Sequence, residues 1–392
     1  WHQWSNDTNE LKSKYEEAVK AYEKENAGVK IKTETLDTEA YKTKINAEFA
    51  GDAKGIDVFY WWGAGTAKKL VDAGKVMALD DYVTDDVKSK ILEGSTSAFE
   101  FDGKLYSVPM FSWYMTLFCN KTMFDKAGAT LPTTYDELVD AVKKLKKLDG
   151  VTPMAAGAKD GWNAAFVYQA LALREVGATG VNEMLSGKKE FGDEGFKKAA
   201  QKVSDLYEMG AFGDNPLEQG NDDANAAFEN GKAAMRLMGS WFANNVYTDD
   251  AATIKPEEVV ALKIPTIADG KGEATDYCGG FVESFWVNNN TKYKEEAAKF
   301  CIYINEKMGV ASYETGSGFS GWTTPADESN LNPLFIQIKD LLAEGKQGVL
   351  AWDTSLESEP AAVHNEQVQT LFADGADIDA FIDEHKAAIN GK

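Results

Sequence analysis

Helical and strand-like patterns alternate along the first hundred residues, and this alternation constrains the fold more than any other feature of the sequence. Apolar residues at helical spacing mark a helix at 8–28, and the alternating stretch 29–36 predicts a half-buried strand. A second helical segment at 41–51 precedes an apolar strand at 56–62, and a third helix and another strand follow. Strands that alternate with helices are typical of parallel sheets in α/β proteins. We therefore predict an α/β fold.

The clearest helix in the rest of the chain is predicted at 133–150. Thr134 and Glu137 have the spacing of a capping box, and apolar residues follow at helical intervals. An apolar, strand-like stretch at 103–124 is interrupted by Pro109. Further strands are predicted at 233–239, 259–265 and 279–290, and a long helix at 292–309. No internal repeat or low-complexity linker marks a domain boundary.

The charge of the chain restricts its partners. A formal net charge of -22 repels phosphate backbones and anionic lipids, so we expect no nucleic-acid partner. The only arginines are Arg174 and Arg236. Because arginine usually provides the bidentate clamps on carboxylates and phosphates, their scarcity argues against an anionic small ligand. No run of 18 apolar residues predicts a membrane-spanning helix.

Motifs for metal, cofactor or nucleophile chemistry do not emerge from the sequence. The three cysteines, Cys119, Cys278 and Cys301, form neither a disulfide framework nor a metal signature, and we expect buried thiols at Cys119 and Cys301. The stretch GSGFSG at 316–321 has dinucleotide-binding spacing but lacks the strand before it and the helix after it, so a loop is predicted. We expect no cofactor, no metal and no catalytic residues. Three scattered histidines and 63 acidic residues nevertheless leave a catalytic triad or a carboxylate pair open.

Tryptophan placement is the most unusual feature of the composition. Several of the ten tryptophans stand beside glycine or at predicted element ends: Trp4, Trp61, Trp62, Trp113, Trp162, Trp241, Trp322 and Trp352. An indole covers the flat C–H face of a sugar ring at low entropic cost, while nearby polar groups bind the hydroxyls. This pattern favours neutral sugar binding, although each ring alone is also compatible with ordinary packing.

Trp61 and Trp62 end an apolar strand just before Gly63. Neighbouring side chains on a strand face opposite ways, so one ring is predicted to point into the core. The other then lies at the carboxyl end of the strand, where open α/β sheets place their ligands. We expect at least one of the two to contact ligand. Trp286, inside the apolar run SFWVN, is predicted to lie in the core.

A series of motifs resembles extracellular solute-binding proteins of ABC importers, in the sugar-binding branch that includes maltose-binding proteins. In chain order they include DVFYWW at 57–62, GKLYSVP at 103–109, NKTMFDKAG at 120–128, GKAAMRLMGSW at 231–241 and GGFVESFWVNNN at 279–290. The resemblance covers essentially the whole chain. It implies a type II periplasmic-binding-protein fold with two discontinuous α/β lobes, joined by hinge strands, and a ligand between them. The first lobe is expected at 1–111 and 265–310, and the second at 112–264 and 311–392.

The resemblance also implies positions for ligand contacts. Trp61 or Trp62, Trp113, Tyr114, Trp241 and Trp352 match aromatic contact positions, while Gly279 and Gly280 would let ligand approach the backbone. Trp162 is added as an indole at an element end. The weaker candidates are Trp4, Asn6, Asp37, Glu283, Trp322 and Asp353, for which a surface or capping role is an equal alternative.

These features together predict a binding protein without catalytic activity. We expect it to capture a neutral oligosaccharide, to shift to a closed state on binding, and to deliver the sugar to the membrane permease subunits of an ABC importer. It is expected to be a monomer outside the cell, as a surface lipoprotein or a periplasmic protein; the lipid-bearing cysteine common in the family is not in this sequence. The alternatives are a glycosidase and a binding protein for peptides or amino acids.

Overall fold

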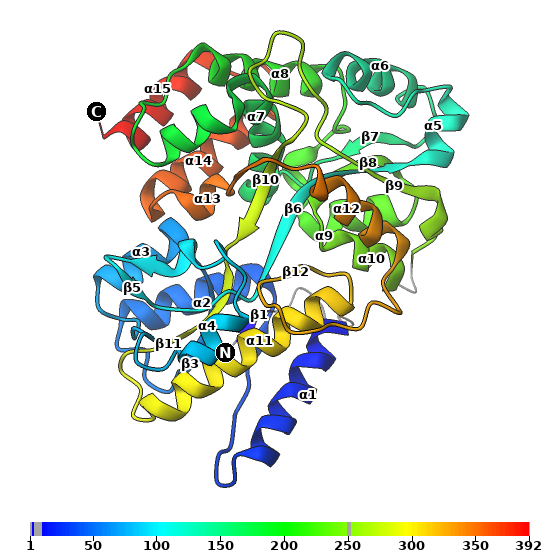
Figure 1. Ribbon diagram of the computed structural model, residues 1–392. Helices are drawn as coiled ribbons and strands as arrows, with labels where there is room; N and C mark the ends of the chain where they lie inside the picture. The colour runs from blue at the N-terminus through cyan, green and yellow to red at the C-terminus, as the bar shows by residue number, and fades with distance from the viewer. Residues whose placement is uncertain (1, 4–9, 249–251, 392) are drawn as a thin grey trace. The chain divides into compact units, whose positions relative to one another are not determined.

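The structure is a computed structural model that describes residues 2–3, 10–248 and 252–391. Contacts group the chain into two compact units (Figure 1). Unit 1 comprises Trp1–Trp113 and Phe281–Leu331, and unit 2 comprises Tyr114–Gly280 and Asn332–Lys392. Each unit is therefore built from separate chain segments. The boundaries between the two lobes were expected after residues 111, 264 and 310 instead.

The shifted boundaries have a structural reason. Strand β10 (Asp276–Phe281) pairs in parallel with β13 (Gln347–Val349), so the segment after residue 265 stays with unit 2. Helix α11 (Lys294–Glu314) continues past residue 310, and Trp322 lies in the core of unit 1. The segment up to Leu331 therefore remains with unit 1.

Unit 1 contains five α-helices and several short strands among its described residues. Besides α11, the helices are α1 (Glu10–Glu25), α2 (Thr38–Ala50), α3 (Ala64–Asp72) and α4 (Asp85–Lys90), with a 3₁₀ turn at Ser97–Phe99. The strands are β1 (His2–Gln3), β2 (Thr35–Leu36), β3 (Val58–Trp62), β4 (Glu100–Phe101), β5 (Lys104–Leu105), β11 (Glu283–Val287) and β12 (Phe319–Ser320).

Strand pairing in unit 1 is mixed. β1 and β2 pair in parallel, although no strand was predicted at the position of β1. β3 instead pairs with β11, which arrives from a distant part of the sequence and runs antiparallel, with Trp62 opposite Glu283. The parallel sheet that the alternation favoured does not include β3, because the partner of β3 comes from outside the first hundred residues.

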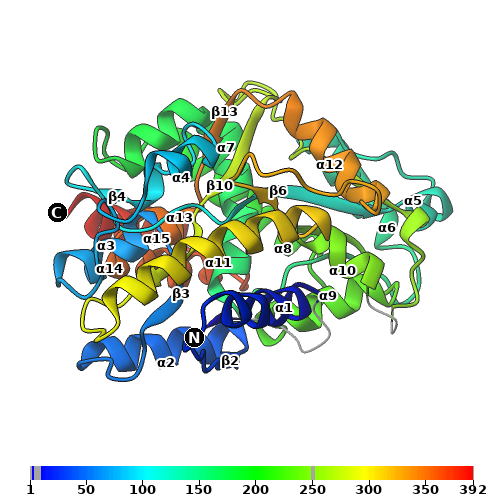
Figure 2. The same ribbon diagram turned by 60° about the horizontal axis from the view of Figure 1, so that its bottom comes forward.

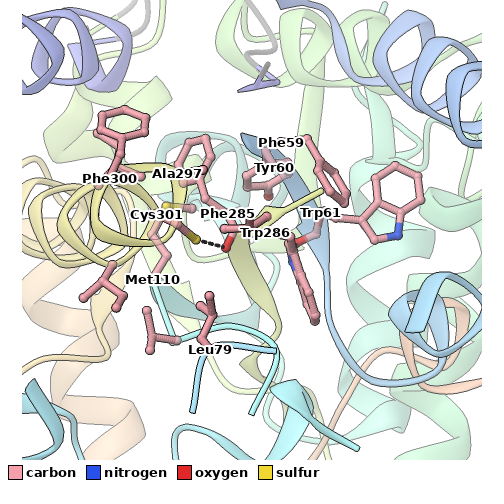
Figure 3. Close-up of a cluster of buried hydrophobic side chains, with 14 of the residues drawn as sticks. Phe59, Tyr60, Trp61, Leu79, Met110, Phe285, Trp286, Ala297, Phe300 and Cys301 are labelled. Carbon is pink, nitrogen blue, oxygen red and sulfur yellow. Dashed lines mark hydrogen bonds between the residues drawn. The ribbon is translucent and has the colours of Figure 1, made fainter. Parts of the chain in front are cut away.

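The core of unit 1 forms around β3 and β11 (Figure 3). Phe59 and Trp286, opposite each other in the register, are both fully buried, so the core position predicted for Trp286 is confirmed. Cys301 on α11 lies in the same cluster, and its thiol donates to the Phe285 carbonyl at 3.0 Å. α1 packs alongside α11 (Figure 2), where Tyr22 meets the Phe300 ring edge-on with centroids 5.1 Å apart.

Unit 2 is organised by a mixed sheet in the order β13, β10, β6, β8, β7, with β9 also paired to β6. Its remaining strands are β6 (Phe111–Asn120), β7 (Thr152–Ala155), β8 (Ala233–Gly239) and β9 (Val259–Leu262). β6 begins in unit 1, where its first residues pair with β12, and continues into unit 2. β7 and β8 are parallel, whereas β6 runs antiparallel to β8 and β9.

Helices surround this sheet. They are α5 (Lys121–Ala127), α6 (Tyr135–Leu145), α7 (Gly161–Leu185), α8 (Glu194–Glu208), α9 (Asn221–Glu229), α10 (Phe242–Thr248), α12 (Pro333–Ala343), α13 (Trp352–Ser355), α14 (Ser358–Thr370) and α15 (Ile378–Asn390), with 3₁₀ turns at Pro216–Glu218 and Pro256–Glu258. The capping box of Thr134 and Glu137 is confirmed at the start of α6. The long apolar helix α7 packs against α8 and α14 and is kinked at Gly177, whose φ is 79°.

Two predictions about the whole chain can be checked on the described residues. The thiols of Cys119, Cys278 and Cys301 are free and buried, and burial raises the pKa of Cys278 to about 12. None of the helices in ranges 10–248 and 252–391 is both long enough and apolar enough to span a membrane.

Candidate functional site

The candidate residues of unit 1 gather at the end of β3. Trp62, its last residue, is half-buried, and its indole Nε1 donates to Oε1 of Glu283 at 3.1 Å. The Lys42 ammonium from α2 lies 5.3 Å from the centre of the Trp62 ring. The indole thus has a carboxylate at its N–H edge and a cation near its face, a polar surround that suits hydroxyl groups.

Trp61 points the other way. It is 5% exposed, belongs to the core of unit 1, and its Nε1 donates to the Thr66 carbonyl at 3.4 Å. Its ring meets that of Trp62 edge-on, with centroids 5.4 Å apart. The alternation predicted for these neighbours is confirmed, and Trp62 is the ring left at the strand end. A ligand contact by Trp62 stays a prediction.

Gly63 explains why the strand stops at Trp62. A Cβ at this position would lie 2.5 Å from the Ala98 carbonyl oxygen and 3.0 Å from the Phe99 ring. Any residue with a side chain would therefore clash here. α3 begins at the next residue, Ala64, whose φ is 53°. The chain turns sharply at this point and leaves Trp62 at the end of β3.

The candidate residues of unit 2 include a group of three rings. Trp162 lies in the first turn of α7 and Trp241 lies between β8 and α10; both are half-buried. Phe166 lies between them, with its ring centre 5.3 Å from that of Trp162 and 6.5 Å from that of Trp241. The six-membered ring of Trp241 covers Gly239, where a Cβ would overlap it. We call Trp162, Phe166 and Trp241 the unit 2 ring group.

Tyr114 adds a second aromatic contact in unit 2. Its ring meets Tyr277 edge-on at 5.2 Å, and its backbone N–H donates to Ser240 Oγ at 3.2 Å. Burial raises the pKa of Tyr277 above its usual value. Sequence reasoning missed Tyr277 and Phe166. The signals were available, since Phe166 stands four residues after Trp162 on one helix face and Tyr277 shortly precedes Gly279.

Two tryptophans predicted to face ligand are core residues instead. Trp352 is 1% exposed, stacks on His364 at 4.9 Å and meets Tyr168 and Phe196 edge-on. Trp322 is 4% exposed, and its Nε1 donates to the buried Pro109 carbonyl at 2.7 Å. Because neighbours from their own unit enclose both rings, we withdraw both from the ligand contacts. Trp113 is also 4% exposed but does not belong to the core cluster of unit 1 that includes Trp322, and a ligand contact by Trp113 stays a prediction.

The polar and glycine candidates have mixed outcomes. Asp37 caps α2 by accepting from the Ala40 N–H at 3.0 Å, which is the capping alternative. Asp353 is half-buried in α13, and its charge helps to raise the pKa of Cys278. Trp4 and Asn6 lie outside the described residues.

The backbone conformation at residues 279 and 280 itself favours glycine. Their φ values are 136° and 149°, a region that side chains rarely tolerate, and a Cβ on Gly280 would lie 2.6 Å from Leu350 Cδ2. Glycine is therefore required at the end of β10 whether or not a ligand approaches.

The two arginines are both engaged inside unit 2. Arg174 donates to the carbonyls of Ile264, Glu273 and Asp276, and Arg236 donates to backbone carbonyls and asparagine side chains. Burial lowers the pKa of Arg174 to about 10 and that of Arg236 to about 9. Among the described residues, no group of three or more His, Cys, Asp or Glu side chains has the arrangement of a metal site.

Known proteins that are similar to this chain include sugar-binding proteins. The multiple sugar-binding protein of Streptococcus mutans serotype c is 23% identical over 326 residues, 79% of this chain and 72% of that protein. A solved structure from work on xylan utilization by the thermophilic bacterium Caldanaerobius polysaccharolyticus is 36% identical, covers 98% of both chains and has a TM-score of 0.93. A chitin oligosaccharide binding protein has the same fold, with a TM-score of 0.88 at 21% identity and coverage of 99% of this chain and 97% of that one.

The fold class predicted from the motifs is therefore confirmed as the type II periplasmic-binding-protein fold. The family model for bacterial extracellular solute-binding proteins matches residues 5–310, well over half of the sequence. The chain belongs to the bacterial extracellular solute-binding protein family.

Proposed function

We propose that this protein binds a neutral oligosaccharide outside the cell and delivers it, chemically unchanged, to the membrane subunits of an ABC importer. The observation that carries the proposal is the placement of half-buried indoles at element ends: Trp62 beside Glu283 in unit 1, and Trp162 and Trp241 in unit 2. Each offers a stiff apolar plate next to polar groups, which matches the two kinds of surface on a sugar ring.

The charges of the chain support a neutral ligand. Both arginine side chains are occupied by internal carbonyls and amides, which leaves lysine as the other basic side chain for an anion. The net charge of -22 opposes an anionic ligand further. The same argument disfavours peptides and amino acids, whose carboxylate terminus requires a fixed cation.

Similarity to carbohydrate receptors supports the ligand class. The 36% identical structure comes from work on xylan utilization, and the relative from Streptococcus mutans is a multiple sugar-binding protein. Several separate indoles favour more than one sugar ring. We therefore infer an oligosaccharide over a monosaccharide. The similarity to sugar-binding proteins favours a receptor over an enzyme, and we propose that this receptor is a monomer.

The proposal is tested by a panel of xylo-, manno-, malto- and galacto-oligosaccharides. Titration calorimetry and the melting temperature report binding, because a ligand that binds only the folded state raises the melting temperature. Chromatography of the recovered sugars reports cleavage. We expect one series to bind and to be recovered intact, and Trp241→Ala to weaken its affinity by about 1–3 kcal/mol. Cleaved sugars would support the glycosidase, and binding of peptides alone would support the other alternative.

A further inference from the structure

A buried arginine lies in the strand that precedes Trp241 of the unit 2 ring group. Arg236 is in the middle of β8 and is 1% exposed. Trp241 follows five residues later, just beyond the end of the same strand. The Arg236 side chain therefore belongs to the strand that leads directly to one of the two candidate stacking rings.

The guanidinium of Arg236 reaches three other chain segments of unit 2. Its Nε donates to Asn225 Oδ1 at 3.1 Å, and one terminal nitrogen donates to the carbonyls of Ala155 and Ala156 at 3.3 and 3.1 Å. The other terminal nitrogen donates to Asn163 Oδ1 at 2.7 Å and to Asn221 Oδ1 at 3.0 Å. These acceptors lie at the end of β7 and just after it, in the first turn of α7, and at the start and in the middle of α9.

Asn163 connects this network to the second stacking ring. It is the residue after Trp162 in the first turn of α7, it is 1% exposed, and its amide also donates to Asn221 Oδ1 at 3.3 Å. Asp160, immediately before α7, accepts from the Asn221 N–H at 2.6 Å. The segment that carries Trp162 is thus tied to β8 through the planar fork of Arg236.

The oxygens that accept hydrogen bonds from Arg236 are all neutral, and the carboxylates of Glu229, Asp160 and Asp222 offset the cost of burying the cation only through their charges. Burial of the side chain costs solvation that neutral partners only partly return. The hydrogen bonds of Arg236 therefore add little to the stability of the fold. Their fixed geometry is well suited to holding β8, α7 and α9 in one arrangement.

We propose that Arg236 is a positioning residue for ligand binding: through Asn163 it fixes the first turn of α7 on β8 and so sets the separation of the Trp162 and Trp241 rings. The inference rests on the proposed function, in which these rings stack on sugar. The spacing of two stacking plates selects among oligosaccharides whose rings are spaced differently, so Arg236 contributes to ligand selectivity without touching the ligand.

Asn163→Ala and Asn225→Ala are a matched pair for the test. Each removes one buried amide acceptor of Arg236, but only Asn163 lies next to Trp162. We expect a similar fall in melting temperature for both variants. Affinity for the bound oligosaccharide should fall about tenfold in Asn163→Ala and less than about twofold in Asn225→Ala. Asn163→Asp keeps an oxygen acceptor for Arg236 and should restore most of the affinity.

Fluorine NMR of protein labelled with 5-fluorotryptophan gives a readout without ligand. Trp162→Phe and Trp241→Phe assign the two resonances. The Trp162 resonance should move in Asn163→Ala and in Arg236→Lys, and should stay in place in Asn225→Ala. An unmoved Trp162 resonance in both variants, or equal affinity losses in Asn163→Ala and Asn225→Ala, would overturn the inference. A moved resonance with unchanged affinity in Trp162→Ala and Trp241→Ala would support the positioning and overturn the stacking surface instead.

Discussion

The Trp62 indole N–H donates to Oε1 of Glu283 at 3.1 Å, across the antiparallel pair of β3 and β11. The two residues are 221 positions apart in the sequence but directly opposite in the strand register. Glu283 is 6% exposed, so its carboxylate is held in place by its surroundings. The bond fixes the plane of the Trp62 ring, and in the proposed binding mode this lowers the entropy lost when a sugar stacks on it.

We expect Glu283→Ala to weaken oligosaccharide affinity by about 1–3 kcal/mol, because the indole N–H loses its acceptor and the ring its fixed orientation. Glu283→Gln keeps a side-chain oxygen for the same bond and should retain most of the affinity. Titration calorimetry on both variants measures the difference. Equal losses in the two variants would mean that the charge of Glu283, and not its bond to Trp62, matters for binding.

Gly239→Ala tests the position of the Trp241 ring without removing it. A methyl group at residue 239 overlaps the six-membered ring, so the ring must move away. We expect an affinity loss close to that of Trp241→Ala, and a double variant no worse than either single one, since both changes remove the same contact. Gly51→Ala is the control, because a Cβ there makes an ordinary 3.5 Å contact. Full affinity in Gly239→Ala would exclude the observed ring position from the binding surface.

Local patterns in the sequence predicted much of this structure. The alternation of strand side chains separated buried Trp61 from half-buried Trp62, and the Thr134–Glu137 spacing marked the start of α6. The alternation could be predicted because successive side chains on a strand point to opposite faces, whatever the rest of the chain does. The stretch 233–239 was predicted as a strand with the bounds that β8 has.

The positions that sequence reasoning missed depend on distant segments. Trp352 was predicted to contact ligand because it stands at a predicted element end and matches an aromatic contact position, but α8 and α14 supply residues that bury it. Its burial is a property of how three helices pack, which no local pattern encodes. The antiparallel partner of β3 was missed for the same reason, since β11 lies more than 200 residues further along the chain.

Trp352→Ala should therefore reduce stability and leave binding unchanged. Truncation of a fully buried tryptophan removes its contacts with Tyr168, Phe196 and His364 and leaves a cavity, which costs about 3–5 kcal/mol. Urea denaturation measures the loss of unfolding free energy, and calorimetry at a temperature where the variant is folded measures affinity. A selective loss of affinity with normal stability would return Trp352 to the candidate ligand contacts.

A chain of buried hydrogen bonds joins α7, α14 and α15 in unit 2. The Phe381 carbonyl accepts from His385 Nδ1 at 2.9 Å, so His385 Nε2 is the acceptor for His364 Nδ1, also at 2.9 Å. His364 Nε2 in turn accepts from Gln169 Nε2 at 3.2 Å, and Gln169 Oε1 accepts from the Trp352 N–H at 3.4 Å. The two bonds accepted by imidazole nitrogens, at His385 Nε2 and His364 Nε2, require neutral imidazoles.

The histidine pair predicts how stability depends on pH. Burial lowers the pKa of His385 to about 4, and burial together with the neighbouring His385 lowers that of His364 well below its usual value. In the unfolded chain both rings take up protons near pH 6.5, so the unfolded state binds more protons than the folded state below that pH. Stability is therefore full above about pH 6.5 and falls as the pH drops toward 4, by about 1.4 kcal/mol per pH unit for each excluded proton.

His385→Gln should reduce the slope of unfolding free energy between pH 4.5 and 6.5 by about half, in urea titrations at several pH values. The window avoids most of the carboxylate titration, so an unchanged slope in this variant would show that the buried pair does not exclude protons.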